Sequence, residues 1–202
     1  ERIGPTLDSI GRFLDSLELP YEIIVVNDGS TDSTAEMVNT YIQSNSRIRL
    51  VHCSSNRGKG FAVRTGALEA KAEDLLISDA DLATPIEEFT KFRQIVRDGI
   101  DVVVGSRALN QSQIIGWRPW YRVLSGKIFN KVVQLLAVSG INDTQCGFKL
   151  FSHGSAAKIF PVASVDGFGF DVEVLFLARK FGYNIHEVPV QWENSPFTKV
   201  SV

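Results

Sequence analysis

Residues 21–32 read YEIIVVNDGSTD, an unbroken apolar run that ends in polar and acidic side chains. A run of Ile and Val without alternation is typical of a strand that is buried on both faces of a sheet. Three further strand-like segments follow at residues 47–52, 75–77 and 101–104, and helix-like segments separate them. This order predicts an α/β fold with a mostly parallel central sheet and helices on both faces.

The helical segments surround these strands along the whole chain. We expect helices at residues 3–17, 33–43, 60–71, 85–99, 121–138, 156–160 and 171–181. A parallel sheet usually begins with a strand, whereas the first element here is a helix, so we expect the first strand to be missing from this chain. Residues 184–192 read as a further strand, and Pro189 within it predicts an edge position.

Composition narrows the class of protein. Lys and Arg number 21 against 23 Asp and Glu, a net charge of −2. A nucleic-acid-binding domain is expected to be basic, so we expect no nucleic-acid partner. Cys53 and Cys146 are too few and too far apart for a disulfide framework or a zinc cluster. No apolar run has the length of a membrane span, and no linker divides the chain, so one domain over residues 1–202 is expected.

Two carboxylates follow the strand at residues 75–77, at the edge of the sheet where α/β proteins bind ligands. Asp79 and Asp81 are spaced i, i+2, and both can reach one hard divalent cation such as Mg²⁺, which also accepts phosphate oxygens. The alternative is a solvated turn that leads into the helix beginning near Pro85.

Polar loops also follow two of the other strands. Asp28 could accept hydrogen bonds from a nucleobase, or its turn sequence could simply cap the chain. Arg57 and Lys59 stand among glycines in the sequence NRGKG, where they could bind phosphate at a helix N-terminus; an exposed basic loop is the alternative. Together, the carboxylates and the basic loop suit a metal-bound diphosphate.

Five motifs occur in a fixed order: VVNDGSTD at 25–32, NRGKG at 56–60, DAD at 79–81, GSR at 105–107 and DTQCGFKLF at 143–151. They resemble family 2 glycosyltransferases of the GT-A fold. More narrowly, they are similar to the dolichyl- or polyprenyl-phosphate glucosyltransferases and the related dolichol-phosphate mannose synthases. The resemblance covers nearly the whole chain. It implies a nucleotide-sugar-binding half at residues 1–110 and an acceptor-binding half at residues 111–202.

On the donor side, the resemblance assigns roles to five residues. It implies that Asp28 contacts the base and that Arg57 and Lys59 lie near the nucleotide. It also implies that Asp79 and Asp81 position Mg²⁺ or Mn²⁺ and the diphosphate. Three positions depart from the family pattern: Asn27, Ala83 and Thr198.

On the acceptor side, the resemblance implies that Arg107, Arg122 and Lys199 bind the acceptor phosphate. Asp143 opens the motif that lines the sugar and acceptor site, where it would orient the sugar or act as a base. The two carboxylates within residues 171–173 suit the dipole at a helix start and could alternatively face the acceptor.

The implied reaction moves a hexose, glucose from UDP-glucose, with inversion onto polyprenyl or dolichyl phosphate. It would take place at the cytoplasmic face of a membrane, with the chain peripheral or anchored by segments outside it. The predicted helix at 121–138 carries an apolar stripe with Lys127 and Lys131 elsewhere. That stripe fits a helix at a membrane interface, and a helix packed on the core is the alternative. The stripe consists of Leu124, Ile128, Val132 and Leu135.

Three other functions remain open. A family 2 transferase could use GDP-mannose or act on a sugar hydroxyl. Phosphohydrolases with an aspartyl nucleophile also carry Asp-x-Asp after a strand, although Ala83 stands where they need Thr or Val. A non-catalytic module that binds nucleotide sugars is the third possibility.

Overall fold

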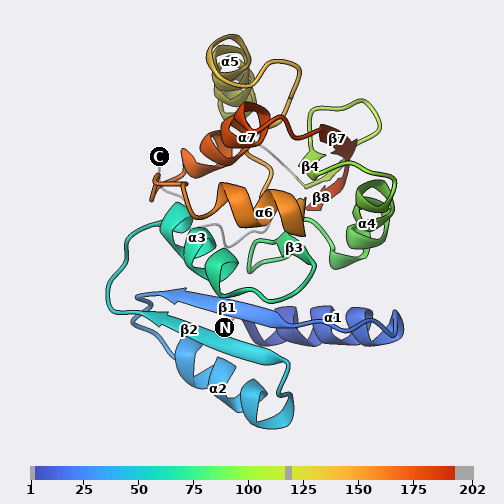
Figure 1. Ribbon diagram of the computed structural model, residues 1–202. Coiled ribbons are helices and arrows are strands. Elements are labelled where there is room, and N and C mark those ends of the chain that lie inside the picture. Colours follow the sequence, from blue (N-terminus) through green and yellow to red (C-terminus); the bar gives the residue numbers. More distant parts are fainter. Residues whose placement is uncertain (1–2, 117–119, 194–202) are drawn as a thin grey trace.

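The computed structural model describes residues 3–116 and 120–193, without the side chains at positions 120–123, 127 and 136. Helices and strands alternate along the first half as the sequence predicts (Figure 1). The elements are α1 Ile3–Ser16, β1 Ile23–Asp28, α2 Thr34–Ser44, β2 Ile48–Cys53, α3 Lys59–Glu69, β3 Asp74–Ile77, η1 Ile86–Glu88, α4 Phe89–Arg97, β4 Val102–Ser106, β5 Gln113–Ile115, α5 Trp120–Leu136, β6 Lys149–Ser152, α6 His153–Ile159, α7 Phe170–Lys180, β7 Ile185–Pro189 and β8 Gln191–Glu193.

Strands β1 and β2 form a parallel pair that helices cover on both faces (Figure 1). Successive side chains of a strand point to opposite faces. Ile23 and Val25 therefore pack with α1 and α2, while Ile24 and Val26 lie against Gly66 of α3. This two-sided burial explains the unbroken apolar run in the sequence.

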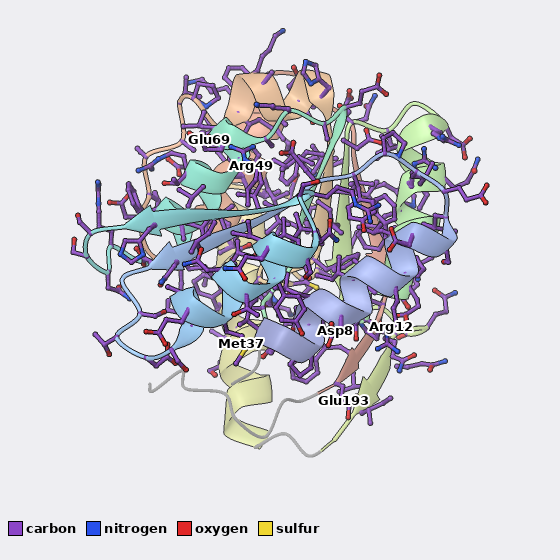
Figure 2. The ribbon with its side chains drawn as sticks, turned by 90° about the horizontal axis from the view of Figure 1, so that it is seen from below. Asp8, Arg12, Met37, Arg49, Glu69 and Glu193 are labelled. Atoms are coloured by element: carbon purple, nitrogen blue, oxygen red, sulfur yellow. The ribbon has the colours of Figure 1, made fainter. Side chains whose placement is uncertain are left out.

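Salt bridges fasten the outer strand β2 to α3. Arg49 donates to Glu69 at the end of α3 over 2.9 Å and to Glu22 over 3.0 Å. Figure 2 shows Arg49 and Glu69 side by side, and Asp8 and Arg12 on the exposed side of α1. These contacts hold the start of β2 against the end of α3.

A second sheet has the strand order β3-β6-β4-β7. β6 runs antiparallel to β3 and β4, whereas β4 and β7 are parallel. Val102 and Val104 face the core formed with α6 and α7, while Val103 faces the core formed with α1 and α4. The α/β class with helices on both faces is therefore confirmed, with β6 as an antiparallel strand inserted among parallel ones.

The two sheets are separate within the described residues. There, β1 pairs with β2 alone and β3 pairs with β6 alone, so no strand joins β1 to β3. α1 spans the two parts, because it packs on α2 and the Thr6 hydroxyl donates to the Ala80 carbonyl over 2.7 Å. This bond ties α1 to the turn that follows β3.

Strand positions at the end of the chain differ partly from the expectation. The stretch predicted as one strand at 184–192 is two strands, β7 and β8, and β8 pairs with β5. Pro189 ends β7, the last strand of its sheet, so the predicted edge position is confirmed. None of the described helices combines the length and the apolar composition needed to cross a membrane.

Candidate active site

Asp79 lies two residues after β3 and contacts two distant parts of the chain. Its Oδ1 accepts a hydrogen bond from Lys59 Nζ at the start of α3, over 2.5 Å. Its Oδ2 lies so close to Gly147 that a Cβ there would be 2.0 Å away. A residue larger than glycine at position 147 would therefore displace the carboxylate. This close contact shows that the 143–151 motif lies next to Asp79.

Lys59 is a cation in this environment. Burial acts to lower its pKa, but the negative charges of Asp79 and Asp171 outweigh burial and raise the pKa above the usual lysine value. The ammonium also lies 5.9 Å from the centre of the Phe170 ring. A positive charge therefore already sits on the first carboxylate of the pair.

Asp81 lies on a tight turn that begins at Asp79. The Leu82 N–H donates to the Asp79 carbonyl over 3.0 Å, and the Ala83 N–H donates to Asp81 Oδ1 over 3.1 Å. Leu82 has a φ of 47°, in the left-handed region that branched side chains rarely adopt. Such conformations cost free energy and cluster at functional sites.

These two carboxylates fit a divalent metal. Asp79 binds one cation in this structure, the Lys59 ammonium. The described residues contain no group of three or more metal-ligating side chains. Mg²⁺ needs only one or two protein carboxylates where substrate phosphates complete its coordination. Asp79 and Asp81 are therefore the residues that would hold it.

Asp28, at the end of β1, binds the backbone of the basic loop. Its carboxylate accepts hydrogen bonds from the N–H groups of Arg57, at 3.0 Å, and Gly58, at 2.7 Å. This contact brings together two loops that were predicted from separate motifs. The assignment of Asp28 to a nucleobase stays a prediction.

The glycines of the basic loop make room for another segment of the chain. A Cβ on Gly58 would lie 2.6 Å from the Asp166 carbonyl oxygen, and one on Gly60 would lie 2.2 Å from the Val165 carbonyl oxygen. The Phe61 N–H, near the start of α3, donates to the same Asp166 oxygen over 3.1 Å. Packing against residues 165–166 is therefore a sufficient reason for these glycines, without a bound phosphate.

The Asp166 carboxylate also binds the arginines of this region. Arg57 donates to it over 2.9 Å and stacks 3.8 Å above the Phe61 ring, while Arg64 donates over 2.7 Å. Hydrogen bonds from these two arginines lower the pKa of Asp166. The role of Arg57 at the nucleotide stays a prediction, and it would require the guanidinium to exchange or share this partner.

Arg107, just after β4, and Asp143 form a bidentate ion pair. Arg107 Nε lies 2.7 Å from Asp143 Oδ2, and Nη2 lies 2.9 Å from Oδ1. Burial acts to raise the pKa of Asp143, but the hydrogen bonds and charge of Arg107 outweigh it and hold the pKa below the usual range. Asp143 is thus a low-affinity proton acceptor, and the geometry favours an orienting role over a basic one.

Glu187 of β7 supports this pair, and the sequence analysis did not single it out. Its carboxylate accepts hydrogen bonds from the backbone N–H groups of Asn142, at 2.9 Å, and Asp143, at 2.7 Å. It therefore fixes the backbone that carries Asp143. In the sequence, Glu187 stands out as a charged residue within a predicted strand, and this feature could have indicated its role.

A second ion pair that the sequence analysis missed is fully buried. Lys149 of β6 donates to Asp171 at the start of α7 and to the Cys146 carbonyl, the latter over 2.6 Å. Asp171 therefore faces Lys149, so an account of it as a helix-dipole residue alone is incomplete. The signal in the sequence was a lysine between Phe148 and Leu150, two apolar neighbours.

The apolar stripe of α5 faces outward. Its four predicted members are between 49% and 85% exposed, so the alternative of a stripe packed on the core is wrong for them. The other side of α5 binds the 141–144 loop: Gln134 donates to the Ile141 carbonyl over 2.8 Å, and Asn130 Oδ1 accepts from the Thr144 hydroxyl over 3.1 Å. Figure 1 shows α5 at the end of the molecule away from β1 and β2.

The structure does not describe the side chains of two predicted acceptor residues. The side chain of Arg122, within α5, is not described, and Lys199 lies beyond the described residues. Their roles stay predictions. Among the predicted residues that are described, the structure brings Asp79 to Lys59, Asp28 to the backbone of Arg57, and Arg107 to Asp143.

Two curated proteins with similar sequences have the same name. The chain is 41% identical over 203 residues to a dolichyl-phosphate beta-glucosyltransferase of Dictyostelium discoideum. This alignment covers 95% of this chain and 62% of that protein. It is 37% identical over 180 residues to the Homo sapiens protein of the same name, over 85% of this chain and 56% of that protein. The chain therefore spans less than two thirds of the length of these relatives.

Solved structures show the same fold. Glucosyl-3-phosphoglycerate synthase from Mycobacterium tuberculosis is similar with a TM-score of 0.68 at 20% identity, over 98% of this chain and 70% of that one. A structure of that synthase in complex with Mn²⁺ and uridine-diphosphate-glucose has a TM-score of 0.62 at 20% identity, over 97% and 68%. Residues 1–160 match the family model described as glycosyl transferase family 2. The sequence, the fold and this match agree, and the chain belongs to glycosyltransferase family 2.

Proposed function

We propose that this chain is the catalytic part of an inverting glucosyltransferase that moves glucose from UDP-glucose to polyprenyl or dolichyl phosphate. The observation that carries the proposal is the contact between the predicted donor and acceptor sides. The Asp79 carboxylate packs on Gly147, within the same motif whose Asp143 binds Arg107. The names of the curated relatives support glucose as the sugar and dolichyl phosphate as the acceptor.

The acceptor chemistry suits these residues. A phosphate monoester has a second pKa near ~6, so a lipid phosphate is largely ionised at neutral pH. It can therefore attack the anomeric carbon without a strong general base, which agrees with the lowered pKa of Asp143. Alignment and charge stabilisation are then the main contributions of the protein.

Each group of residues has one task in this proposal. Asp79 and Asp81 hold a divalent metal, which supplies positive charge to the leaving diphosphate. Arg57 and Lys59 add positive charge from the basic loop. Asp143 fixes the guanidinium of Arg107 beside the acceptor phosphate, and Arg122 and Lys199 are the further phosphate ligands.

The exposed face of α5 supports action at a membrane surface. An amphipathic helix with an apolar face can lie in the interface between headgroups and acyl chains. We propose that this surface lies on the cytoplasmic side of the membrane. The chain would bind the membrane peripherally or be anchored by segments outside this chain.

The test is release of UDP from UDP-glucose in the presence of Mg²⁺ or Mn²⁺, with and without a polyprenyl phosphate. We expect release that needs both metal and lipid, and none from Asp79→Ala, whose circular dichroism should stay native. GDP-mannose serves as the competing donor. Preferential turnover of GDP-mannose would overturn the choice of sugar. Release of phosphate from simple monoesters, or donor binding without any turnover, would overturn the transferase.

A further inference from the structure

The contact between Lys59 and Asp79 joins a lysine of the basic loop to a carboxylate of the predicted metal site. The Nζ–Oδ1 distance is 2.5 Å, and the two side chains are 29% and 36% exposed. Gly147 packs against this carboxylate, closest to Oδ2. The ammonium of Lys59 is therefore the cation that Asp79 Oδ1 binds in this structure.

We infer that Lys59 occupies the cation position at Asp79 when no divalent metal is bound, and that it leaves Asp79 for the donor diphosphate when metal and nucleotide bind. This inference rests on the proposed function. Mg²⁺ binds carboxylate oxygens at about 2.0–2.1 Å, so an ammonium at hydrogen-bond distance from the same oxygen would meet it with strong repulsion. The two cations therefore compete for Asp79 Oδ1.

Lys59 has a structural reason to pair with Asp79 before the donor arrives. Asp81 lies two residues away, and the charge of Asp171 also acts on the ammonium. Without Lys59, the Asp79 carboxylate would have no salt bridge among the described residues and would keep only the weaker charge interaction with Arg107. Lys59 thus holds Asp79 in place and acts as a positioning residue.

The exchange makes metal and nucleotide binding cooperative. A metal alone must displace Lys59, and the released ammonium has no new anion to bind. When a diphosphate is present, the ammonium gains a phosphate partner in exchange for the carboxylate. A ligand shifts an equilibrium only by its differential affinity for the two states, and here the diphosphate supplies that difference.

Binding of Mn²⁺ without nucleotide tests the competition directly. The electron paramagnetic resonance signal of free Mn²⁺ gives the dissociation constant for wild type and Lys59→Met. We expect a roughly tenfold smaller constant for Lys59→Met, the size of a coupling of ordinary strength between two sites. Arg64→Met is the matched control, because it removes the same charge from the same helix, α3, but its guanidinium binds Asp166. We expect this control to change the constant less than about twofold.

A second measurement uses the wild-type protein and does not depend on how the variants fold. Amine-reactive labelling followed by mass spectrometry reports how accessible Lys59 is. Saturating Mn²⁺ without nucleotide should raise the labelling rate of Lys59, and adding UDP should lower it again. Lys91, which pairs with Glu88, is the internal reference.

Two results would overturn the inference and leave the proposed function intact. One is an equal Mn²⁺ dissociation constant in wild type and Lys59→Met, with binding still abolished by Asp79→Asn. The other is a labelling rate of Lys59 that Mn²⁺ does not change. Mn²⁺ binding that Asp79→Asn leaves intact would instead refute the metal site, and with it both proposals.

Discussion

Replacing Lys149 by methionine isolates the energetic role of the buried ion pair behind the site. The Lys149 and Asp171 side chains are 1% and 3% exposed, and Lys149 also donates to the Cys146 carbonyl. Methionine has a similar length and no charge, so the change leaves an unpaired carboxylate in the core. Breaking a buried pair in this way costs about 3–5 kcal/mol.

This cost is large enough to measure by thermal unfolding. In a domain of this size, 1 kcal/mol shifts the melting temperature by about 2–4 °C, so Lys149→Met should melt roughly 6–20 °C below wild type. Circular dichroism at 222 nm and urea unfolding at pH 7 give the two readouts. A loss below about 1 kcal/mol, an ordinary value for a point mutation, would refute the assignment of a charged pair in the core.

The double variant Lys149→Met with Asp171→Leu measures the interaction between the two residues apart from the contribution of each side chain. Replacing both charges by apolar side chains of similar volume is often neutral or stabilising. We expect the double variant to recover most of the stability lost in Lys149→Met, so that its loss is much smaller than the sum of the two single losses. Additive losses would show that the two residues do not depend on each other.

Three other variants test separate parts of the site. Gly147→Ala should weaken Mn²⁺ and UDP binding at least tenfold by isothermal titration, because its Cβ would reach 2.0 Å from Asp79, while melting stays within a few degrees. The folded pKa of Asp143 lies below its ordinary 3.8, so this carboxylate stabilises the protein above about pH 4 and loses that effect as the pH falls through the folded pKa. Asp143→Asn should therefore be less stable than wild type at pH 7, and urea titrations should show the gap closing below pH ~4. Leu135, on the exposed face of α5, is 85% exposed, so Leu135→Glu should leave the melting temperature unchanged and reduce sedimentation with anionic liposomes. Unchanged liposome binding would remove α5 from the membrane contact.

Strands with long apolar runs could be predicted from the sequence alone. β1 and β4 are buried on both faces, so each reads as an unbroken series of Ile and Val. β6 could not be found in this way, because it is four residues long and contains Lys149. Its place between β3 and β4 depends on pairing with residues 45 to 78 positions away, and sequence periodicity carries no information on such partners.

The positions of the charged side chains could be predicted better than their partners. The strand-end rule places Asp28, Asp79 and Arg107 near one edge; in the structure Asp28 ends β1, and the other two follow β3 and β4. The contacts of Asp79 with Lys59 and of Arg107 with Asp143 join residues 20 and 36 positions apart. Such contacts depend on the tertiary fold, and they decide whether a charge is free to meet a ligand.

The 142–149 segment explains why this site needs a rigid scaffold more than a reactive side chain. Gly147 contacts Asp79, Asp143 binds Arg107, and Thr144 binds Asn130 of α5. One short segment thus fixes the distance between the predicted donor side, the predicted acceptor side and the exposed helix. Displacements of about 1 Å can cost two orders of magnitude in rate when alignment is the main catalytic contribution. The buried Lys149 pair anchors this segment to α7, so its loss should lower turnover as well as stability.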